Sequence, residues 1–293
     1  MKFAAIDIGS NAVRLLIARP LDLNVVVPNF KSVEVTRLPL RLGDDVFNKG
    51  EISEKKQDLL FKAMTAFKYL IEIYNVDSYR AVATSAMRDA SNGKEIVKQI
   101  KKKTAISIEV ISGLDESLLL QKTILTTITN DKTYLHIDVG GGSTELTIIK
   151  NKKTVAFESF DIGTVRMLEG AIHKDEQIRM SNWLQSISLQ YHNIRAIGTG
   201  GNIVKLNTLG NPSQKKPMTL SMLKIINEHI SQLKQEERVY GLGLNPDRAQ
   251  VIDSAGKIFI DILTQSSIDK IFAPNKGLKD GIILGLWQDF FLG

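Results

Sequence analysis

Two glycine-containing turns hold the residue types best suited to bind phosphate. Residues 3–10 read Phe-Ala-Ala-Ile-Asp-Ile-Gly-Ser and residues 135–143 read Leu-His-Ile-Asp-Val-Gly-Gly-Gly-Ser, with aspartates 131 residues apart (138 − 7). In the second turn Gly140, Gly141 and Gly142 expose consecutive backbone N–H groups that can form an anion-binding concavity, to which Ser143 and Thr144 add hydroxyl donors. A single turn of this kind is often only a tight turn that needs glycine. Two copies favour phosphate binding.

Two acidic residues flank the second glycine turn. Asp138 and Glu145 are seven residues apart (145 − 138), a spacing that can bring two carboxylate oxygens to one hard cation. Mg²⁺ typically takes one or two carboxylates together with substrate phosphate and water. We therefore expect Asp138 and Glu145 to bind Mg²⁺ or Mn²⁺. The alternative is that the two acids only cap turns.

The two turns belong to a pattern of strands and helices that occurs twice. We expect a first domain over residues 1–128 and a second over 129–293, whose last helix, 278–290, has the option of packing back on the first domain. Strands alternating with helices indicate an α/β fold with mixed sheets. If the domains are related by a pseudo-twofold axis, the two turns face each other across an interdomain cleft. The expected strands are 3–8, 13–18, 79–83, 106–111, 135–139, 146–149, 154–160, 194–198 and 268–272, and the expected helices are 53–74, 92–102, 116–128, 177–191, 219–233, 247–263 and 278–290.

Composition excludes several classes of protein. The 293 residues include no cysteine, which removes disulfides, zinc–cysteine sites, iron–sulfur clusters and thiol nucleophiles. No apolar run reaches membrane-spanning length, and Asp7 interrupts the apolar start of the chain. The net charge of +6 suits polyanions, yet only 6% of residues are aromatic and no nucleic-acid-binding signature occurs. We expect a cytoplasmic protein that binds neither membrane nor nucleic acid.

Other site types are also absent from the sequence. The four histidines, His136, His173, His192 and His229, are not spaced for a metal, so we expect structural roles for them. Neither the phosphate-loop lysine signature nor a complete Gly-x-Gly-x-x-Gly fingerprint occurs. These absences argue against P-loop and Rossmann enzymes.

Five motifs in order resemble the exopolyphosphatase/guanosine pentaphosphate phosphohydrolase family. They are Asp7-Ile8-Gly9-Ser10-Asn11, residues 83–90 (Ala-Thr-Ser-Ala-Met-Arg-Asp-Ala), residues 111–117 (Ile-Ser-Gly-Leu-Asp-Glu-Ser), residues 138–145 (Asp-Val-Gly-Gly-Gly-Ser-Thr-Glu) and Gly198-Thr199-Gly200-Gly201. Further matches lie at 41–43, 163–166 and 277–281. The resemblance implies two actin-like, sugar-kinase-like domains, removal of terminal phosphate from polyphosphate or a guanosine pentaphosphate, and a homodimer.

The resemblance also implies roles for single residues. Glu116 matches the family's proposed base for the attacking water, at a helix start where a glutamate is also favoured by the helix dipole alone. Because Leu114, Asp115 and Ser117 depart from the commoner residues, either Asp115 or Glu116 could hold the water. The remaining phosphate-binding residues that it implies are Asp7, Gly9, Ser10, Asn11, Arg88, Gly200 and Gly201.

Several arginines are candidates for contacts with the substrate. Arg88 follows an apolar strand, where a guanidinium can form a bidentate contact with phosphate oxygens, although a surface arginine is the simpler alternative. Arg14 could reach either a phosphate or a guanine, and Arg248 is a weaker candidate. Near Arg248 and at Lys279-Asp280 the chain departs from the family pattern. A kinase of the same superfamily and a non-catalytic binder of guanosine polyphosphates remain alternative functions.

Overall fold

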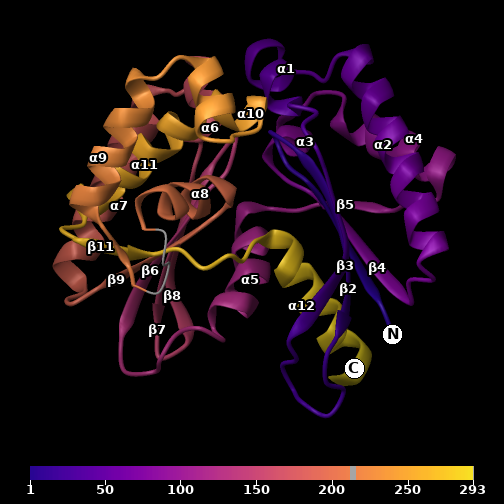
Figure 1. The fold of residues 1–293 in the computed structure, drawn as a ribbon, viewed down its shortest axis with the longest axis horizontal. Coiled ribbons are helices and arrows are strands. Elements are labelled where there is room, and N and C mark those ends of the chain that lie inside the picture. The colour runs from indigo at the N-terminus through magenta and orange to yellow at the C-terminus, as the bar shows by residue number, and fades with distance from the viewer. Residues whose placement is uncertain (212–215, 293) are drawn as a thin grey trace. The chain divides into compact units, whose positions relative to one another are not determined.

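The computed structural model describes residues 1–211 and 216–292, which fold as two compact units (Figure 1). Unit 1 comprises Met1–Thr126 together with the C-terminal segment from Gly277, and unit 2 comprises Thr127–Lys276. The domain boundary predicted after residue 128 lies just beyond Thr126. Each unit holds one mixed β-sheet with helices packed on it, so the predicted α/β class is confirmed.

Unit 1 consists of one sheet and the helices that pack on it. Its strands are β1 (Phe3–Ile8), β2 (Val13–Pro20), β3 (Phe30–Leu38), β4 (Ser78–Ala83) and β5 (Ile108–Val110), and its helices are α1 (Leu42–Lys49), α2 (Glu54–Ile73), α3 (Ser85–Asp89), α4 (Gly93–Thr104), α5 (Gly113–Ile124) and α12 (Leu278–Leu292). The strand order is β3-β2-β1-β4-β5. The first three strands are antiparallel, whereas β4 runs parallel to both β1 and β5.

The two faces of this sheet carry different helices. Ala4, Ile6 and Ile8 of β1 pack in a core with side chains of α1, α2 and α4, while Phe3 and Ala5 pack with side chains of α5 and α12. Side chains alternate between faces along a strand. Asp7 therefore lies on the face that carries α5, the helix that includes Glu116.

The final helix, α12, is an integral part of unit 1. Its Trp287 is almost fully buried, packs edge-on against Phe3 and donates a hydrogen bond from Nε1 to the Val26 carbonyl at 3.2 Å. The sequence analysis assigned this helix to the second domain and allowed it to pack on the first. In the structure it completes the core of unit 1. None of the helices described within residues 1–211 and 216–292 is long and apolar enough to cross a membrane.

Unit 2 repeats the arrangement of unit 1 with more helices. Its strands are β6 (Thr133–Val139), β7 (Thr144–Lys150), β8 (Lys153–Phe160), β9 (Arg195–Thr199), β10 (Met218–Thr219) and β11 (Lys270–Phe272). The helices are α6 (Thr164–Leu168), α7 (Lys174–Gln190), α8 (Gly201–Gly210), α9 (Leu220–Gln232), the π-helix η1 (Glu237–Gly241), α10 (Pro246–Ala249) and α11 (Ile252–Gln265). The strand order is β10-β11-β9-β6-β7-β8, in which β6, β7 and β8 are antiparallel and β9 and β11 run parallel to β6.

The predicted duplication is confirmed by this topology. In both units an antiparallel three-strand meander is followed by strands parallel to its first strand. Asp7 and Asp138 are each the penultimate residue of that first strand. Asp7 pairs across the sheet with Arg14, and Asp138 pairs with Glu145. The same position thus carries a basic residue in unit 1 and an acidic one in unit 2.

Two predicted helices differ from the structure. The single helix expected over 247–263 is divided into α10 and α11, because the guanidinium of Arg238 donates to the Ala249 carbonyl at 2.9 Å and occupies an acceptor that a continuous helix would use. The helix expected from Glu116 begins earlier, at Gly113, because Ser112 caps it. The elements that were not predicted from the sequence are the strands β3 and β10 and the helices α1, α3, α6, α8 and η1.

Candidate active site

The glycine turn between β6 and β7 directs its backbone N–H groups to one side. The turn is closed by a hydrogen bond from the Gly140 N–H to the Ser143 carbonyl, at 2.9 Å. Its other carbonyls accept from the start of α6: Thr164 N to Gly140 O (3.0 Å), Val165 N to Gly141 O (2.8 Å) and Arg166 Nε to Gly142 O (2.9 Å). In a planar trans peptide each C=O points opposite to the next N–H. The N–H groups of Gly141, Gly142 and Ser143 therefore point away from α6, an arrangement that is suited to binding an anion.

Gly163 makes this arrangement possible. A Cβ atom at Gly163 would lie 2.4 Å from the Gly141 carbonyl oxygen. Cβ atoms in proteins essentially never come within 3.0 Å of such a neighbour. The start of α6 can approach the turn only because residue 163 has no side chain. The sequence analysis found Gly163 in a family motif and assigned it no role. In the structure, Gly163 allows the start of α6 to pack against the glycine turn.

A row of polar side chains crosses the sheet of unit 2 beside this turn. Asp138 on β6 lies opposite Glu145 on β7 and, on its other side, opposite Thr199 on β9. Side chains directly opposite in neighbouring strands lie on the same face and close together. Asp138 is 8% exposed and Glu145 is 1% exposed. Hydroxyl groups orient both acids, Thr199 Oγ1 donating to Asp138 Oδ1 (2.5 Å) and Ser159 Oγ donating to Glu145 Oε1 (2.9 Å).

The donor set fits a hard cation. Paired carboxylates that are buried and held by hydroxyl groups supply the oxygen ligands that Mg²⁺ and Mn²⁺ prefer. Within residues 1–211 and 216–292 there is no group of three or more His, Cys, Asp or Glu side chains that could hold a metal. Such an ion would therefore take one or two protein carboxylates, as Mg²⁺ commonly does, and complete its shell with phosphate and water.

His136 lies next to this row, on the same face of β6 as Asp138. Its Nε2 is 2.8 Å from Thr199 Oγ1. The ring is completely buried, and this burial lowers the pKa of His136 to about 3, so the imidazole is neutral at ordinary pH. Among the described residues no group bonds to its Nδ1 atom.

The turn between β1 and β2 in unit 1 is built in the same way. Gly9 N donates to Ala12 O at 3.1 Å, which matches the Gly140 to Ser143 bond of unit 2. The carbonyls of Ser10 and Asn11 accept from Gly43 N (2.8 Å) and Arg41 N (3.0 Å). By the same planarity argument, the N–H groups that follow these carbonyls point away from α1. The Ser10 hydroxyl is buried and lies 2.8 Å from that of Ser85.

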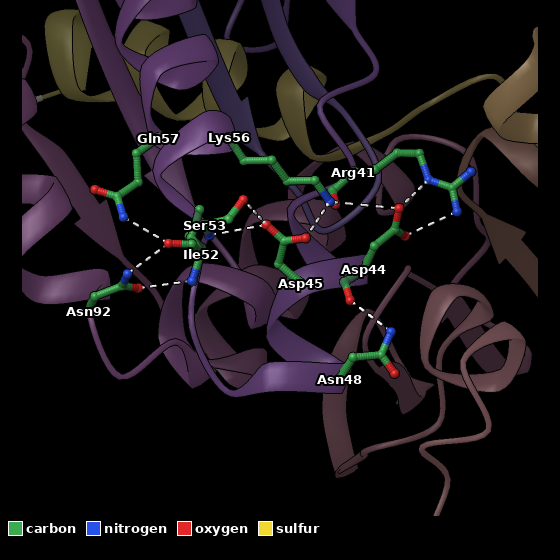
Figure 2. A network of polar contacts seen from close by, with 9 residues as sticks. All are labelled: Arg41, Asp44, Asp45, Asn48, Ile52, Ser53, Lys56, Gln57 and Asn92. Carbon is green, nitrogen blue, oxygen red and sulfur yellow. Dashed lines mark hydrogen bonds and ion pairs between the residues drawn. The ribbon is translucent and has the colours of Figure 1, made fainter.

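An ionic network holds the segment that supports this turn (Figure 2). Arg41 forms two hydrogen bonds to the Asp44 carboxylate, at 2.7 and 3.0 Å. Lys56 of α2, whose side chain is 17% exposed, donates to the Arg41 carbonyl and pairs with Asp45 at 3.2 Å and with Asp44 at 3.7 Å. The Ser53 hydroxyl also donates to Asp45 (2.5 Å). The network thus ties the start of α1 to the start of α2 and fixes the Arg41 and Gly43 N–H groups.

The candidates for the water-orienting group differ in their surroundings. Asp115 forms a capping box with Ser112, accepting from the Ser112 hydroxyl (2.6 Å) and N–H (3.2 Å). These hydrogen bonds lower the pKa of Asp115 and make its carboxylate a weaker base. Glu116 follows it in the first turn of α5 and is half-buried. The surroundings therefore favour Glu116 as the base.

The candidate arginines have partners within their own units. Arg14 Nη1 lies 2.7 Å from Asp7 Oδ2. Arg88 on α3 donates to the Ile111 carbonyl at 3.1 Å. The Arg248 guanidinium lies over the start of α8, since a Cβ at Gly201 would be 2.7 Å from Arg248 Nη2. Arg248 is thereby placed at a helix N-terminus, where backbone N–H groups favour anions.

The structure differs from the sequence analysis on one predicted phosphate donor, Thr144, and adds three residues to the site. The Thr144 hydroxyl donates its proton to the Ile162 carbonyl (2.5 Å), so this hydroxyl supports the turn rather than offering a donor to phosphate. Thr199, Ser159 and His136 orient the acidic pair but were not among the predicted site residues. The alternation of His136 and Asp138 along one strand, which places both on one face, was the signal that could have indicated His136.

Comparisons with known proteins match almost the whole chain. The model of the Ppx/GppA phosphatase family matches residues 23–290. The guanosine-5'-triphosphate,3'-diphosphate pyrophosphatase of Aliivibrio fischeri (strain MJ11) is 25% identical over 298 residues, which cover 97% of this chain and 59% of that protein. The chain thus spans little more than half the length of this curated relative.

Solved structures agree with the fold. The crystal structure of the Aquifex aeolicus member of the Ppx/GppA family superimposes with a TM-score of 0.79 at 25% identity, covering 99% of both chains. An exopolyphosphatase from Cytophaga hutchinsonii gives a TM-score of 0.85 at 22% identity, covering 99% of this chain and 98% of that one. The predicted α/β fold with two mixed sheets is confirmed. The match of the family model over residues 23–290, most of the chain, shows that this chain belongs to the Ppx/GppA phosphatase family.

Proposed function

We propose that this chain is a metal-dependent phosphohydrolase that releases orthophosphate from the end of linear polyphosphate. One observation carries the proposal: in unit 2 the buried pair Asp138 and Glu145 flanks a glycine turn whose N–H groups point to one side. A terminal phosphate bound to those N–H groups would lie beside the two carboxylates. The net charge of +6 favours a polyanionic substrate of this kind.

The proposal assigns the metal to the acidic pair. Asp138 and Glu145 would hold Mg²⁺ or Mn²⁺, which when bound neutralises charge on the terminal phosphate. The hydroxyl groups of Thr199 and Ser159 hold the two carboxylates in place. In unit 1 the corresponding pair, Asp7 and Arg14, is neutral as a whole and is not a cation site.

Glu116 is the proposed base. A water oxygen attacks the terminal phosphorus, the bond from phosphorus to the bridging oxygen breaks, and Glu116 accepts the proton of the water. The products are orthophosphate and a polyphosphate shorter by one unit. Because phosphoryl transfer depends mainly on positioning and charge neutralisation, the protein needs only a held metal, oriented N–H donors and one base.

Guanosine pentaphosphate is the second proposed substrate. The Aliivibrio fischeri relative is named for an activity on guanosine-5'-triphosphate,3'-diphosphate. In this chain Arg248 lies at the N-terminus of α8, a position suited to a further phosphate group. The same hydrolysis at the 5'-terminal phosphate would yield the tetraphosphate.

A phosphate-release assay tests the proposal. The purified chain is incubated with polyphosphates of several lengths, guanosine pentaphosphate and ATP, with Mg²⁺, with Mn²⁺ and with a chelator. We expect release from polyphosphate that the chelator abolishes, and we expect Asp138→Asn and Glu145→Gln to raise the metal concentration needed for half-maximal rate.

Other outcomes would point to the alternative functions. Consumption of ATP only when an acceptor alcohol is present would indicate a kinase. Tight binding of guanosine pentaphosphate without phosphate release, even with Mg²⁺, would indicate a binding protein. Metal dependence identical to that of the parent in both acid variants would exclude Asp138 and Glu145 as metal ligands.

A further inference from the structure

A chain of buried hydrogen bonds leads from His136 to Asp138. Nε2 of His136 lies 2.8 Å from Oγ1 of Thr199, and this hydroxyl donates to Oδ1 of Asp138 at 2.5 Å. His136 and Thr199 are both fully buried, and Asp138 is buried. The chain therefore links the proposed metal ligand to a residue deeper in the sheet of unit 2.

The directions of these hydrogen bonds follow from counting protons. A threonine hydroxyl has one proton, and an ionised carboxylate can only accept. Because the Thr199 proton goes to Asp138, the Thr199 oxygen must accept from His136. Nε2 of His136 therefore carries a proton and donates it. If Nε2 were an acceptor instead, Thr199 would have to turn its proton away from Asp138.

The duplicated unit shows that the fold does not require this polar chain. Asp7 occupies the position of Asp138 in unit 1, and there the residue two positions earlier is Ala5 and the residue opposite on the parallel strand is Val82. Both are fully buried and apolar. Unit 2 instead buries an imidazole whose Nδ1 has no hydrogen-bond partner among the described residues, an arrangement that is unfavourable for stability alone.

We propose that Thr199 and His136 are positioning residues that fix the orientation of the Asp138 carboxylate and thereby set the affinity of the site for a divalent cation. Thr199 acts directly on Asp138, and His136 acts through Thr199 by fixing the direction of its hydroxyl. The proposal rests on the proposed function, in which Asp138 and Glu145 hold the metal. Loss of groups that orient metal ligands typically lowers metal affinity by about 10- to 100-fold.

The test measures Mn²⁺ binding to the full chain without substrate, by electron paramagnetic resonance, beside metal activation of phosphate release. The variants Thr199→Val and His136→Leu introduce apolar side chains of the kind that unit 1 has at these positions. We expect each to weaken Mn²⁺ binding by about 10- to 100-fold. We expect Thr199→Ser and His136→Gln, which keep a donor at the same place, to bind Mn²⁺ nearly as tightly as the parent.

A double variant and a matched control sharpen the test. Since both residues act through one hydrogen-bonded chain, Thr199→Val combined with His136→Leu should weaken Mn²⁺ binding by less than the product of the single effects. Thr104→Val is the control, because Thr104 is a buried threonine of unit 1 whose hydroxyl also donates, to Ile100 O, and accepts, from Ile106 N. Its Mn²⁺ affinity should equal that of the parent.

The outcomes separate this proposal from the proposed function. Parent-like Mn²⁺ affinity in folded Thr199→Val, with weak binding in Asp138→Asn, would overturn the positioning roles and leave the metal site standing. Parent-like affinity in Asp138→Asn as well would overturn the metal site itself. Circular dichroism melts identify unfolded variants. If His136→Leu does not fold, Thr199→Val and Thr199→Ser still decide the question.

Discussion

Nη1 of Arg14 lies 2.7 Å from Oδ2 of Asp7, an ion pair that has no counterpart at the equivalent position of unit 2. There the residue opposite Asp138 is Glu145, so that two acidic residues face each other on neighbouring strands. The two halves of the duplicated chain have thus diverged at one cross-strand position. Unit 1 pairs its aspartate with a guanidinium, while unit 2 places a second acidic residue at the same position.

This ion pair predicts that Arg14 supports Asp7 rather than binding the nucleotide. We expect Arg14→Gln to lower kcat/KM by about tenfold on both polyphosphate and guanosine pentaphosphate, because the buried Asp7 carboxylate loses its charged partner whatever the substrate. Steady-state kinetics on both substrates provide the measurement. A loss confined to guanosine pentaphosphate would show that Arg14 contacts the guanine.

The capping box at the start of α5 separates the two acids at 115 and 116. Glu116→Gln should lower kcat by about 10²- to 10⁴-fold with little change in substrate affinity, the range typical of a general base. Asp115→Asn should keep most of the activity and lose about 0.5 kcal/mol of stability, since it weakens a helix cap. Activity and urea unfolding of both variants decide the matter. An inactive Asp115→Asn beside an active Glu116→Gln would reverse the assignment.

Gly163 supports the glycine turn without contacting substrate. A Cβ there would overlap the Gly141 carbonyl, so Gly163→Ala should displace the turn and lower kcat/KM by about 100-fold or more. Gly277→Ala is the control, because the nearest atom to a Cβ at Gly277 is Asp280 Oδ2 at 3.9 Å. Kinetics together with thermal melts test this expectation, and parent-like kinetics in Gly163→Ala would contradict it.

The network around Lys56 offers a test of the unit 1 turn. Lys56→Met leaves Asp44 and Asp45 without their shared ammonium, and we expect a loss of about 1 to 3 kcal/mol in unfolding free energy and lower activity on both substrates. Lys62→Met, on the same helix, removes only an exposed pair with Asp58, in which the Lys62 side chain is 71% exposed. It should change stability by less than about 0.5 kcal/mol. Equal effects of the two substitutions on urea unfolding would show that the network does not hold the turn.

Burial of His136 predicts a dependence of stability on pH. The folded-state pKa of about 3 lies below the ordinary value of 6.5, so the unfolded chain binds the extra proton between these pH values. The unfolding free energy should therefore fall as pH drops below about 6.5, by up to about 1.4 kcal/mol per pH unit from this group.

His136→Leu isolates that contribution. Urea unfolding at pH 6.5 and pH 5 should show the parent losing about 2 kcal/mol more than His136→Leu. His192→Gln removes an exposed histidine and should keep the acid sensitivity of the parent. Acid sensitivity unchanged in His136→Leu would show that His136 is not buried as a neutral ring.

Much of this protein was determined by the sequence itself. The two Asp-Gly turns, their spacing and the alternation of strands and helices were sufficient to predict the α/β class and the duplication, because backbone turns and strand periodicity are local properties. The family was indicated by the resemblance of five motifs in order. Ser53 and Asn92, predicted to open helices, are the N-caps of α2 and α4. Asp138 and Glu145 were predicted as a pair because one hairpin sets their separation.

Tertiary structure decided which groups surround the predicted residues. Thr199 comes to Asp138 from a strand 61 residues away (199 − 138), and Lys56 reaches Asp45 from another helix. By contrast, the cap that separates Asp115 from Glu116 is local, because Ser112 and Asp115 have the spacing of a capping box. The division of the 247–263 helix also depended on a contact that forms only in the folded chain, from the Arg238 guanidinium to the Ala249 carbonyl. Such contacts join residues that no local pattern relates, and for that reason the folded structure alone specifies them.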